Sequence, residues 1–525
     1  MMGDICVAFE ACTLSLGKMP ASPAAPRADN LPPALAALTG RPTCRVEAVQ
    51  PGDVCFLFAE YFRPSVWEDH QDYHPKIAAA AQRGAAAVVW DEETAHPPPP
   101  DQRAAFGVPL LAVPDARAAF GAYAHRFFGL PARDMPVVGV TGTNGKTSVV
   151  QLLRQLQTGG PPPARAKPRP AASIGTLGVF HGDQQSAEAA YTTPLAHDLA
   201  ATLADLRDRG TARVGLEVSS HALALDRVAG LDLAAGIVTN VTRDHLDFHG
   251  TPAAYAAAKK RLLEVLPAGA PVILNADDPG ARALAPAARG PVWWYGINAP
   301  AADVRAVNVK ISAHGSRFSL QLAQSPSPPS PEVSTQLVGR FQISNILAAV
   351  TALHALGGDW AALCASVARV TPVPGRMETV ALPNGATGLV DYAHNPDGLH
   401  NLLANCRELP HRRLLLVFGA GGDRDRGKRP EMAAIAAAGA DAVILTSDNP
   451  RTEDPAQIFA DLRAGFPEGV AYPVIADRAA AIRAGYNAAA AGDLLVVAGK
   501  GHERTQTIGT TAHPFSDLAQ LRALL

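Results

Sequence analysis

Cysteine is scarce in this sequence, and its positions exclude two classes of small protein module. None of the cysteines stands in a CxxC pair or at a zinc-binding spacing, so neither a disulfide framework nor a zinc module is indicated. Free thiols in a reducing compartment are the better interpretation, and we expect a cytoplasmic protein. The six positions among 525 residues are Cys6, Cys12, Cys44, Cys55, Cys364 and Cys406.

Long apolar runs and concentrations of positive charge are also missing. No segment is apolar for long enough to cross a bilayer, and Asp4 and Glu10 stand where a secretion signal would be basic and then apolar. The 46 Lys and Arg residues nearly balance the 48 Asp and Glu residues, which gives no electrostatic footprint for nucleic acid or anionic lipid. We expect small-molecule substrates, no nucleic-acid or membrane partner, and a monomer.

What the sequence does have is a glycine-rich stretch, GVTGTNGKTS at 139–148, between an apolar run and a helix-like segment. Its glycines allow backbone N–H groups to face an anion, while the lysine can reach outer phosphates and the threonine can ligate magnesium. Val140 stands where a strict Walker A motif has its first glycine, so the loop is a variant. An ordinary strand–turn–helix corner is the alternative. The candidate nucleotide contacts are Gly142, Thr143, Asn144, Gly145, Lys146, Thr147 and Ser148.

The chain is long enough for roughly three or four domains. Residues 1–134 look like a small α/β module, and 135–370 alternate strands and helices as a nucleotide-binding α/β domain does. Residues 371–525 predict a second doubly wound unit, in which Arg424 replaces the third glycine of a dinucleotide fingerprint and disfavours a dehydrogenase. A strand is expected at Tyr472–Ile475. Proline-rich loops are expected at 97–100, 161–170 and 325–331.

Polar residues follow two predicted strands of the 135–370 segment. Glu217 stands near the carboxyl end of the strand at 213–218, and His245 lies in a dense polar cluster after the strand at 236–241. Ligands bind at this edge of open α/β sheets, so both residues, with Thr147, are candidate metal ligands. Each could instead be a hydrogen-bonded structural residue, and Ser219 could be a helix N-cap.

Ten motifs in order resemble the Mur ligases of peptidoglycan synthesis, from about Val108 to the C-terminus. They are GVTGTNGKTS, EVSSHAL, TNVTRDHLDFHG, YAAAK, GRFQISNILAA, VPGRME, VDYAHNPDGL, GGDRDRGKRP, SDNPRTEDP and AGKGHE. The resemblance implies an α/β protein of three domains: an N-terminal UDP-sugar-binding-like domain, a central P-loop ATPase domain and a C-terminal Rossmann-like, amino-acid-binding domain. It is greatest to the members that add meso-diaminopimelate.

The resemblance also implies a reaction. The D-glutamate γ-carboxylate of UDP-N-acetylmuramoyl-L-Ala-D-Glu would attack the γ-phosphate of ATP, with Mg²⁺ present, to give an acyl phosphate that the amine of diaminopimelate opens to an amide. Phosphate is a far better leaving group than oxide, and Lys146 and magnesium would stabilise the developing charge.

Site residues carry over from the same motifs. The implied catalytic residues are Lys146, Glu217, His245 and Lys259, and the implied metal ligands are Thr147, Glu217, His245 and Lys259, the last as a carbamate formed with CO2. The implied further nucleotide contacts are Asn345, Arg376 and Asp391, for which a helix cap and a surface pair are the alternatives. The implied contacts to the UDP-muramoyl peptide are Thr192, Thr193, Ser219 and Arg227. The implied contacts to the amino acid are Arg424, Asp448, Asn449, Pro450, Arg451, Gly499 and Glu503.

Arg451 carries the expected amine specificity. Diaminopimelate has a second carboxylate at the far end of its side chain, which an arginine fork can bind through paired hydrogen bonds, and lysine has none.

The chain departs from the family pattern at a few positions. Leu225 replaces a glutamine, Gln342 an asparagine and Ala420 a cysteine, and 45–47 read Arg-Val-Glu where the family has Asp-Ser-Arg. Either the first domain still binds the nucleotide sugar in a divergent form, or the chain is a paralogous amide ligase, folylpolyglutamate- or cyanophycin-like, with another substrate. A P-loop nucleotide-binding regulatory protein is the alternative from a different class.

Overall fold

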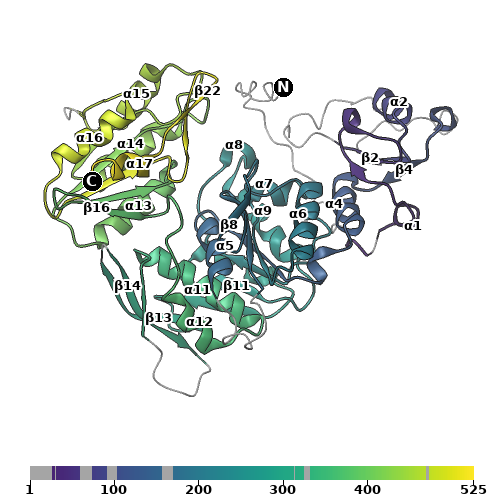
Figure 1. Ribbon diagram of the computed structural model, residues 1–525, viewed down its shortest axis with the longest axis horizontal. Helices are drawn as coiled ribbons and strands as arrows, with labels where there is room; N and C mark the ends of the chain where they lie inside the picture. Colours follow the sequence, from purple (N-terminus) through teal and green to yellow (C-terminus); the bar gives the residue numbers. More distant parts are fainter. Residues whose placement is uncertain are drawn as a thin grey trace. The chain divides into compact units, whose positions relative to one another are not determined.

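A computed structural model of the chain describes residues 27–29, 31–58, 74–91, 103–156, 169–312, 314–323, 332–468 and 472–525 (Figure 1). Cys6, Cys12 and the loops expected at 97–100, 161–168 and 325–331 lie outside the described residues. By their contacts the residues fall into two compact units. The first unit holds the described residues up to Asp303 together with 348–363, and the second unit holds 304–347 and 364–525. The division into three domains stays a prediction.

The first unit begins with a four-stranded parallel sheet. The strands run in the order β1 (Pro42–Thr43), β2 (Val54–Leu57), β3 (Ala87–Asp91) and β4 (Leu110–Val113). Helix α4 (Ala116–Phe127) packs on this sheet through Phe120 and Tyr123, whose rings lie 5.3 and 5.5 Å from that of Phe56. The Asp115 carboxylate caps α4 by accepting from Ala118 N at 2.8 Å. Shorter helices here are α1 (Pro33–Ala36) and α2 (His74–Gln82).

The larger sheet of the first unit carries the glycine-rich stretch. Its strands run in the order β12-β11-β10-β5-β9-β6-β7-β8, parallel from β12 to β6 and antiparallel through β7 and β8. The strands are β5 (Val137–Thr141), β6 (Ala172–Gly175), β7 (Gly178–His181), β8 (Gln184–Ala187), β9 (Val214–Glu217), β10 (Ala235–Val238), β11 (Val272–Asn275) and β12 (Val292–Gly296). The central strands β5, β9 and β10 are buried along their whole length, as expected of parallel strands covered on both faces.

Helices cover this sheet and begin at its carboxyl edge. They are α5 (Lys146–Gln155), α6 (Ala196–Asp208), α7 (Ser220–Ala224), α8 (Leu246–His249), α9 (Pro252–Val265) and α10 (Pro279–Ala283). Because β5, β9 and β10 are adjacent and parallel, the residues that follow them meet at one edge of the sheet.

The second unit contains an antiparallel ribbon and a second α/β sheet. The ribbon is formed by β13 (Val304–Ser312), β14 (Gly315–Leu322) and β15 (Glu332–Thr335), and two helices, α11 (Arg340–Ala355) and α12 (Trp360–Val367), follow it in sequence. The α/β sheet runs in the order β16 (Glu378–Ala381), β17 (Thr387–Asp391), β20 (Leu494–Ala498), β18 (Leu414–Phe418) and β19 (Ala442–Leu445). Only β16 is antiparallel to its neighbour.

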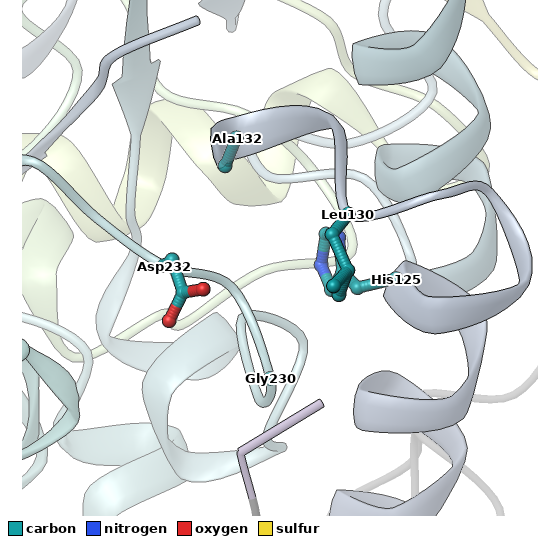
Figure 2. Close-up of a pocket in the computed structure, with 5 residues that line it drawn as sticks. All are labelled: His125, Leu130, Ala132, Gly230 and Asp232. Carbon is teal, nitrogen blue, oxygen red and sulfur yellow. The ribbon is translucent and has the colours of Figure 1, made fainter. Parts of the chain in front are cut away.

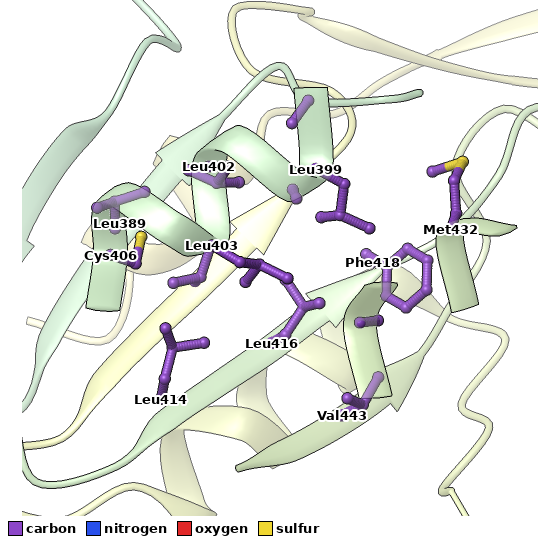
Figure 3. Close-up of a cluster of buried hydrophobic side chains, with 14 of the residues drawn as sticks. Leu389, Leu399, Leu402, Leu403, Cys406, Leu414, Leu416, Phe418, Met432 and Val443 are labelled. Carbon is purple, nitrogen blue, oxygen red and sulfur yellow. The ribbon is translucent and has the colours of Figure 1, made fainter. Parts of the chain in front are cut away.

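Helices α13 (Pro396–Glu408) and α14 (Lys428–Gly439) close the main core of this sheet, where Leu399, Leu416 and Met432 are fully buried (Figure 3). The remaining elements are α15 (Pro455–Arg463), α16 (Arg478–Ala488), α17 (Asp517–Arg522) and a hairpin of β21 (Thr505–Ile508) and β22 (Thr511–Pro514).

The strand expected at Tyr472–Ile475 is wrong. Only Val474 pairs there, as an isolated bridge to Leu445. Pro473 has no N–H to extend a ladder, and the Tyr472 ring instead stacks on Phe466 at 3.8 Å.

None of the helices in the described part of the chain combines the length and apolarity that a bilayer crossing needs.

His125 is a buried imidazole on α4, and neither of its ring nitrogens has a hydrogen-bond partner among the residues that the structure describes. Figure 2 shows it beside Leu130, Ala132, Gly230 and Asp232, which line the same small pocket. Burial lowers the pKa of His125 to about 4. The unfolded chain, with an ordinary imidazole, therefore takes up this proton at higher pH than the folded chain does, and stability is lost as the pH falls below about 6.5.

We expect His125→Leu to make the free energy of unfolding less sensitive to acid. Between pH 7 and pH 5 the variant should lose about 2 kcal/mol less than the parent chain, from the depressed pKa of this one group. Urea unfolding at the two pH values measures the difference, and the exposed His513→Leu is the control. An equal loss in the parent chain and in His125→Leu would contradict this assignment.

Candidate active site

The glycine-rich loop after β5 is held in place by the two residues that follow β10, Thr239 and Asn240. Gly142 has φ of +151°, and a Cβ there would stand 1.8 Å from Thr239 Oγ1. Asn240 accepts from Thr143 N through its carbonyl at 3.0 Å, and from Asn144 N through Oδ1 at 2.8 Å. Gly145, at φ of +89°, precedes the first turn of α5. An ordinary strand–turn–helix corner, the alternative considered for this loop, would not need contacts from the residues after β10. The contacts with Thr239 and Asn240 therefore favour the phosphate loop.

Lys146 and Thr147 are the first two residues of helix α5, directly after the loop. Lys146 Nζ donates to the carbonyls of Gly142 and Thr143 at 2.8 and 2.9 Å. Thr147 Oγ1 donates to Glu217 Oε2 at 3.2 Å, and Ser148 is buried. A helix N-terminus with a lysine and an adjacent hydroxyl is a phosphate-binding arrangement.

Glu217 is the buried carboxylate of the site. It ends β9, is 1% exposed, and accepts from Thr147 Oγ1, from Thr176 N at 2.9 Å and from Thr176 Oγ1 at 3.2 Å. Gly175 is required beside it, because a Cβ there would lie 2.1 Å from Glu217 Oε1. A carboxylate and a hydroxyl at the end of a phosphate loop are oxygen donors of the kind that Mg²⁺ prefers.

The expected contacts to the acid substrate gather around the same strand end. Thr176 Oγ1 lies 3.1 Å from Thr192 Oγ1, and Thr193 Oγ1 donates to the Glu217 carbonyl at 2.8 Å. Arg227 Nη1 donates to the Thr193 carbonyl at 3.0 Å, and its guanidinium lies over the Tyr191 ring.

Ser219 is an N-cap, the structural role that was the alternative to a substrate contact for this residue. Its hydroxyl accepts from Ala222 N at 3.1 Å and so caps α7, while its own N–H donates to Thr193 Oγ1.

Lys259 is a buried lysine beside the phosphate loop. It lies on α9, is 1% exposed, and its Nζ makes no hydrogen bond or ion pair with any residue that the structure describes. Burial first, and then the nearby Lys146 cation, hold the pKa of Lys259 well below its ordinary range. Lys259 Nζ lies 4.5 Å from the centre of the Tyr255 ring, whose hydroxyl donates to Thr143 Oγ1 at 3.2 Å.

Three histidines gather beside α9. The ring of His221 lies 4.8 Å from His245 and 5.5 Å from His249, and His249 Nε2 lies 3.0 Å from Ser220 Oγ. Burial lowers the pKa of His221 to about 3 and that of His249 to about 4. His245 is more exposed and precedes α8 with φ of +51°. Within the described ranges, no three His, Cys, Asp and Glu side chains form a metal-holding group.

The three further nucleotide contacts expected from the resemblance lie in the second unit. Both oxygens of Asp391 accept backbone N–H groups at 2.9 Å, from Met377 and Ala393, and burial raises the pKa of Asp391. The Arg376 guanidinium lies 4.6 Å over the Tyr392 ring. Asp391 is thus buried rather than half of a surface pair.

Asn345 lies inside α11, not at its cap, and Asn345 Nδ2 donates to Gln342 Oε1 at 3.1 Å. Gln342, one of the departures from the family pattern, therefore orients it.

The expected amino-acid contacts meet at the carboxyl edge of the C-terminal sheet. A Cβ at Gly499 would lie 2.4 Å from Asp448 Oδ2, so this carboxylate packs directly on the glycine. Asn449 Nδ2 donates to Glu503 Oε2 at 2.9 Å.

Arg451 has the left-handed φ of +52° and donates from Nη1 to the Gly422 carbonyl at 2.7 Å. A Cβ at Gly421 would lie 3.1 Å from Arg451 Nη1 and 3.9 Å from Arg424 Cγ, so both arginines approach the same side of that glycine. A Cβ at Gly422 would meet the Pro450 carbonyl.

Of the other departures from the family pattern, Leu225 and Ala420 are buried, and the stretch at 45–47 lies in a turn after β1. Leu225 packs in the core with Phe120, and Ala420 is buried in the core of the C-terminal sheet. Arg45 and Glu47 are exposed around a single 3-10 turn after β1.

Two polar residues with central positions were not singled out from the sequence. Asn240 follows β10 and Thr176 follows β6, and both strands lie within two positions of β5 in the sheet. Their signal is positional: polar residues directly after parallel strands share one edge with the phosphate loop.

The phosphate loop and its carboxylate place the chain among P-loop nucleotide-binding proteins. The Mur ligase middle domain matches residues 140–353, and the Mur ligase glutamate ligase domain matches residues 375–501. The UDP-N-acetylmuramoyl-L-alanyl-D-glutamate--2,6-diaminopimelate ligase of Parasynechococcus marenigrum is 44% identical over 419 residues, 78% of this chain and 81% of the relative. The chain belongs to the Mur ligase family.

Solved structures agree with this membership. One of a UDP-N-acetylmuramoyl-L-alanyl-D-glutamate--2,6-diaminopimelate ligase is 33% identical, with a TM-score of 0.63 over 93% of this chain and 94% of that chain. A MurF ligase of Thermotoga maritima in complex with ADP shares the fold, at 17% identity and a TM-score of 0.55 over 89% of this chain and 95% of that chain. The expected family and fold class are therefore confirmed.

We expect Gly142→Ala to weaken ATP binding by at least about tenfold, because its Cβ would displace Thr239 and with it the loop. Calorimetric titration with a non-hydrolysable ATP analogue measures the effect. Gly269→Ala is the matched control, since Gly269 also has positive φ but nothing within 4 Å of an added Cβ. Equal affinities in the two variants would rule out the packing that we assign to Gly142.

Proposed function

We propose that this chain is an ATP-dependent ligase that joins UDP-N-acetylmuramoyl-L-Ala-D-Glu to meso-diaminopimelate in peptidoglycan synthesis. The observation that carries the proposal is the buried Glu217 carboxylate, which connects phosphate-loop Thr147 to Thr176 and, through the strand end, to Thr193. A nucleotide site and an acid-substrate site that share one buried carboxylate suit the transfer of a phosphoryl group between them. The names of the relatives supply the substrates.

In this reaction the substrate carboxylate attacks the γ-phosphate of ATP, the bond to ADP breaks, and an acyl phosphate forms. The incoming amine then attacks the acyl carbon, forms the amide and displaces phosphate. Lys146 would leave the loop carbonyls that it now contacts and turn to the outer phosphates. Its charge and the N-terminus of α5 would stabilise the negative charge of the transferred group.

Magnesium fits the donor set at the loop. Thr147 Oγ1 and the Glu217 carboxylate already lie within hydrogen-bond distance of each other and are hard oxygen ligands. A bound Mg²⁺ would neutralise charge on the phosphates.

Lys259 fits conversion to a carbamate. A buried amine with a lowered pKa is the neutral nucleophile that reacts with CO2, and it has no ion pair in the described part of the chain. Addition of CO2 to the neutral amine forms an N–C bond and releases one proton to water, and the resulting carbamate anion would attract the Lys146 cation and provide oxygen ligands near His245. Lys259 and His245 would then hold a second magnesium ion.

The selector of the amine is the group of Arg424, Arg451, Asp448, Asn449 and Glu503. The two arginines around Gly421 can bind a carboxylate, while Glu503 and Asp448 can accept from an ammonium group. Diaminopimelate has both groups at the far end of its side chain, whereas lysine has only the ammonium group.

We further propose that the protein works in the cytoplasm, as a monomer. The four cysteines in the described residues, Cys44, Cys55, Cys364 and Cys406, are free thiols, as a reducing compartment would keep them.

The test of the proposed function is phosphate release from ATP. Turnover should require the UDP-muramoyl dipeptide and diaminopimelate together, with kcat/KM for diaminopimelate about a hundredfold or more above that for lysine. Arg451→Leu should reduce this preference, since it removes one fork for the distal carboxylate. Turnover indifferent to both substrates would indicate a nucleotide-binding regulator, and turnover with a folate or another acid would indicate a paralogue.

Carbamylation is tested with ¹³C-bicarbonate. NMR should show a carbamate signal in the parent chain and none in Lys259→Ala. The rate of Lys259→Ala should be lower by about a hundredfold or more. Lys260→Ala is the matched control, because Lys260 is a partly exposed neighbour paired with Glu264 at 3.1 Å. An unmodified amine at saturating bicarbonate, with full rate in Lys259→Ala, would refute the assignment.

A further inference from the structure

Lys500 is a fully buried lysine directly behind the proposed amine selector. It follows Gly499 after β20 and is 0% exposed, which is uncommon for lysine unless it is paired. Lys500 Nζ donates to Glu503 Oε2 at 2.6 Å and to Asn449 Oδ1 at 2.9 Å. Lys500 is not among the residues proposed to contact the nucleotide, the metal ions or either substrate.

The contacts of Lys500 fix which atoms of the selector remain available. Oε2 of Glu503 accepts from Lys500 and from Asn449 Nδ2, so the Glu503 carboxylate is held in one orientation with Oε1 left for a ligand. The Asn449 amide is fixed in the same way, because Oδ1 accepts from Lys500 and from Thr507 N at 2.9 Å. Charge-assisted hydrogen bonds of this length are the stronger kind.

The β21–β22 hairpin holds the backbone of the selector. Gln506 Nε2 donates to the Asp448 carbonyl at 2.7 Å, and Arg451 N donates to the Thr507 carbonyl at 3.1 Å. Gly509 N donates to the Arg451 carbonyl at 2.7 Å. These bonds stabilise Arg451 in its left-handed conformation, which a non-glycine residue keeps only when its surroundings hold it there.

We propose that Lys500 and Gln506 are positioning residues for the amine substrate. Lys500 holds Glu503 and Asn449, Gln506 holds the backbone at Asp448, and together they set the affinity for the amino acid without touching it. The inference rests on the proposed function only in the identity of that amino acid, since the network orients the selector for any amine bound there.

The test compares KM values for the three substrates. Lys500→Met should raise KM for diaminopimelate by about tenfold or more, and Gln506→Leu by a smaller factor of about threefold. KM for ATP and for the UDP-muramoyl dipeptide should stay unchanged. Thr511→Ala, at an exposed position of the same hairpin, is the control and should match the parent chain.

A double variant separates positioning from general destabilisation. If Lys500 acts through Glu503, then Lys500→Met with Glu503→Gln should raise KM no further than the worse single variant does. Additive effects, an unchanged amine KM in Lys500→Met, or a parallel rise of all three KM values in both Lys500→Met and Gln506→Leu would overturn the proposal. Should Lys500→Met fail to fold, the Gln506→Leu comparison decides alone.

The amine used in these assays is the one that supports turnover in the parent chain. If that is lysine, the proposed function fails while the KM comparison still tests Lys500 and Gln506. If no amine stimulates ADP release, both proposals are overturned.

Discussion

The buried carboxylate of Glu217 is the constraint on which the arrangement at the carboxyl edge of the large sheet depends. A charge removed from water must be compensated, and here hydroxyl and amide donors from Thr147 and Thr176 do so. Because those donors belong to the phosphate loop and to the residue after β6, compensating one charge connects the loop to a neighbouring strand end. Thr193, bonded to the Glu217 carbonyl, extends the connection to Arg227.

In the second unit, too, buried charged groups with polar partners hold nearby residues in place. The residues proposed to select the amine are polar side chains on loops, and loops do not hold side chains in place by themselves. Buried cations behind the loops supply the rigidity: Lys500 beneath Asn449, and Arg478, which pairs with Asp517 and donates to the Ala498 carbonyl. A polar binding site is thus built on a buried polar network in which charges are paired.

Much of this could be predicted from the sequence. The glycine-rich stretch identified the phosphate loop, and strand periodicity placed Glu217 at a carboxyl edge. The sequence places Lys259 on the same face of α9 as Tyr255, Leu262 and Leu263, but a lysine on such a face usually extends its charged end to water, so the pattern alone did not predict its full burial. Thr176 and Lys500 were missed for another reason: their contacts are with residues 41 and 51 positions away, and only Thr176 has a sequence signal, its place directly after a parallel strand.

In the proposed reaction, a substrate carboxylate takes a phosphoryl group at the Glu217 edge of the sheet. Labelling the D-glutamate γ-carboxylate of the UDP-muramoyl dipeptide with ¹⁸O tests it most directly, by mass analysis of the phosphate released during amide formation. An acyl phosphate predicts that one ¹⁸O atom moves from the carboxylate to phosphate. Phosphate without that label, its new oxygen taken from water, would contradict the account.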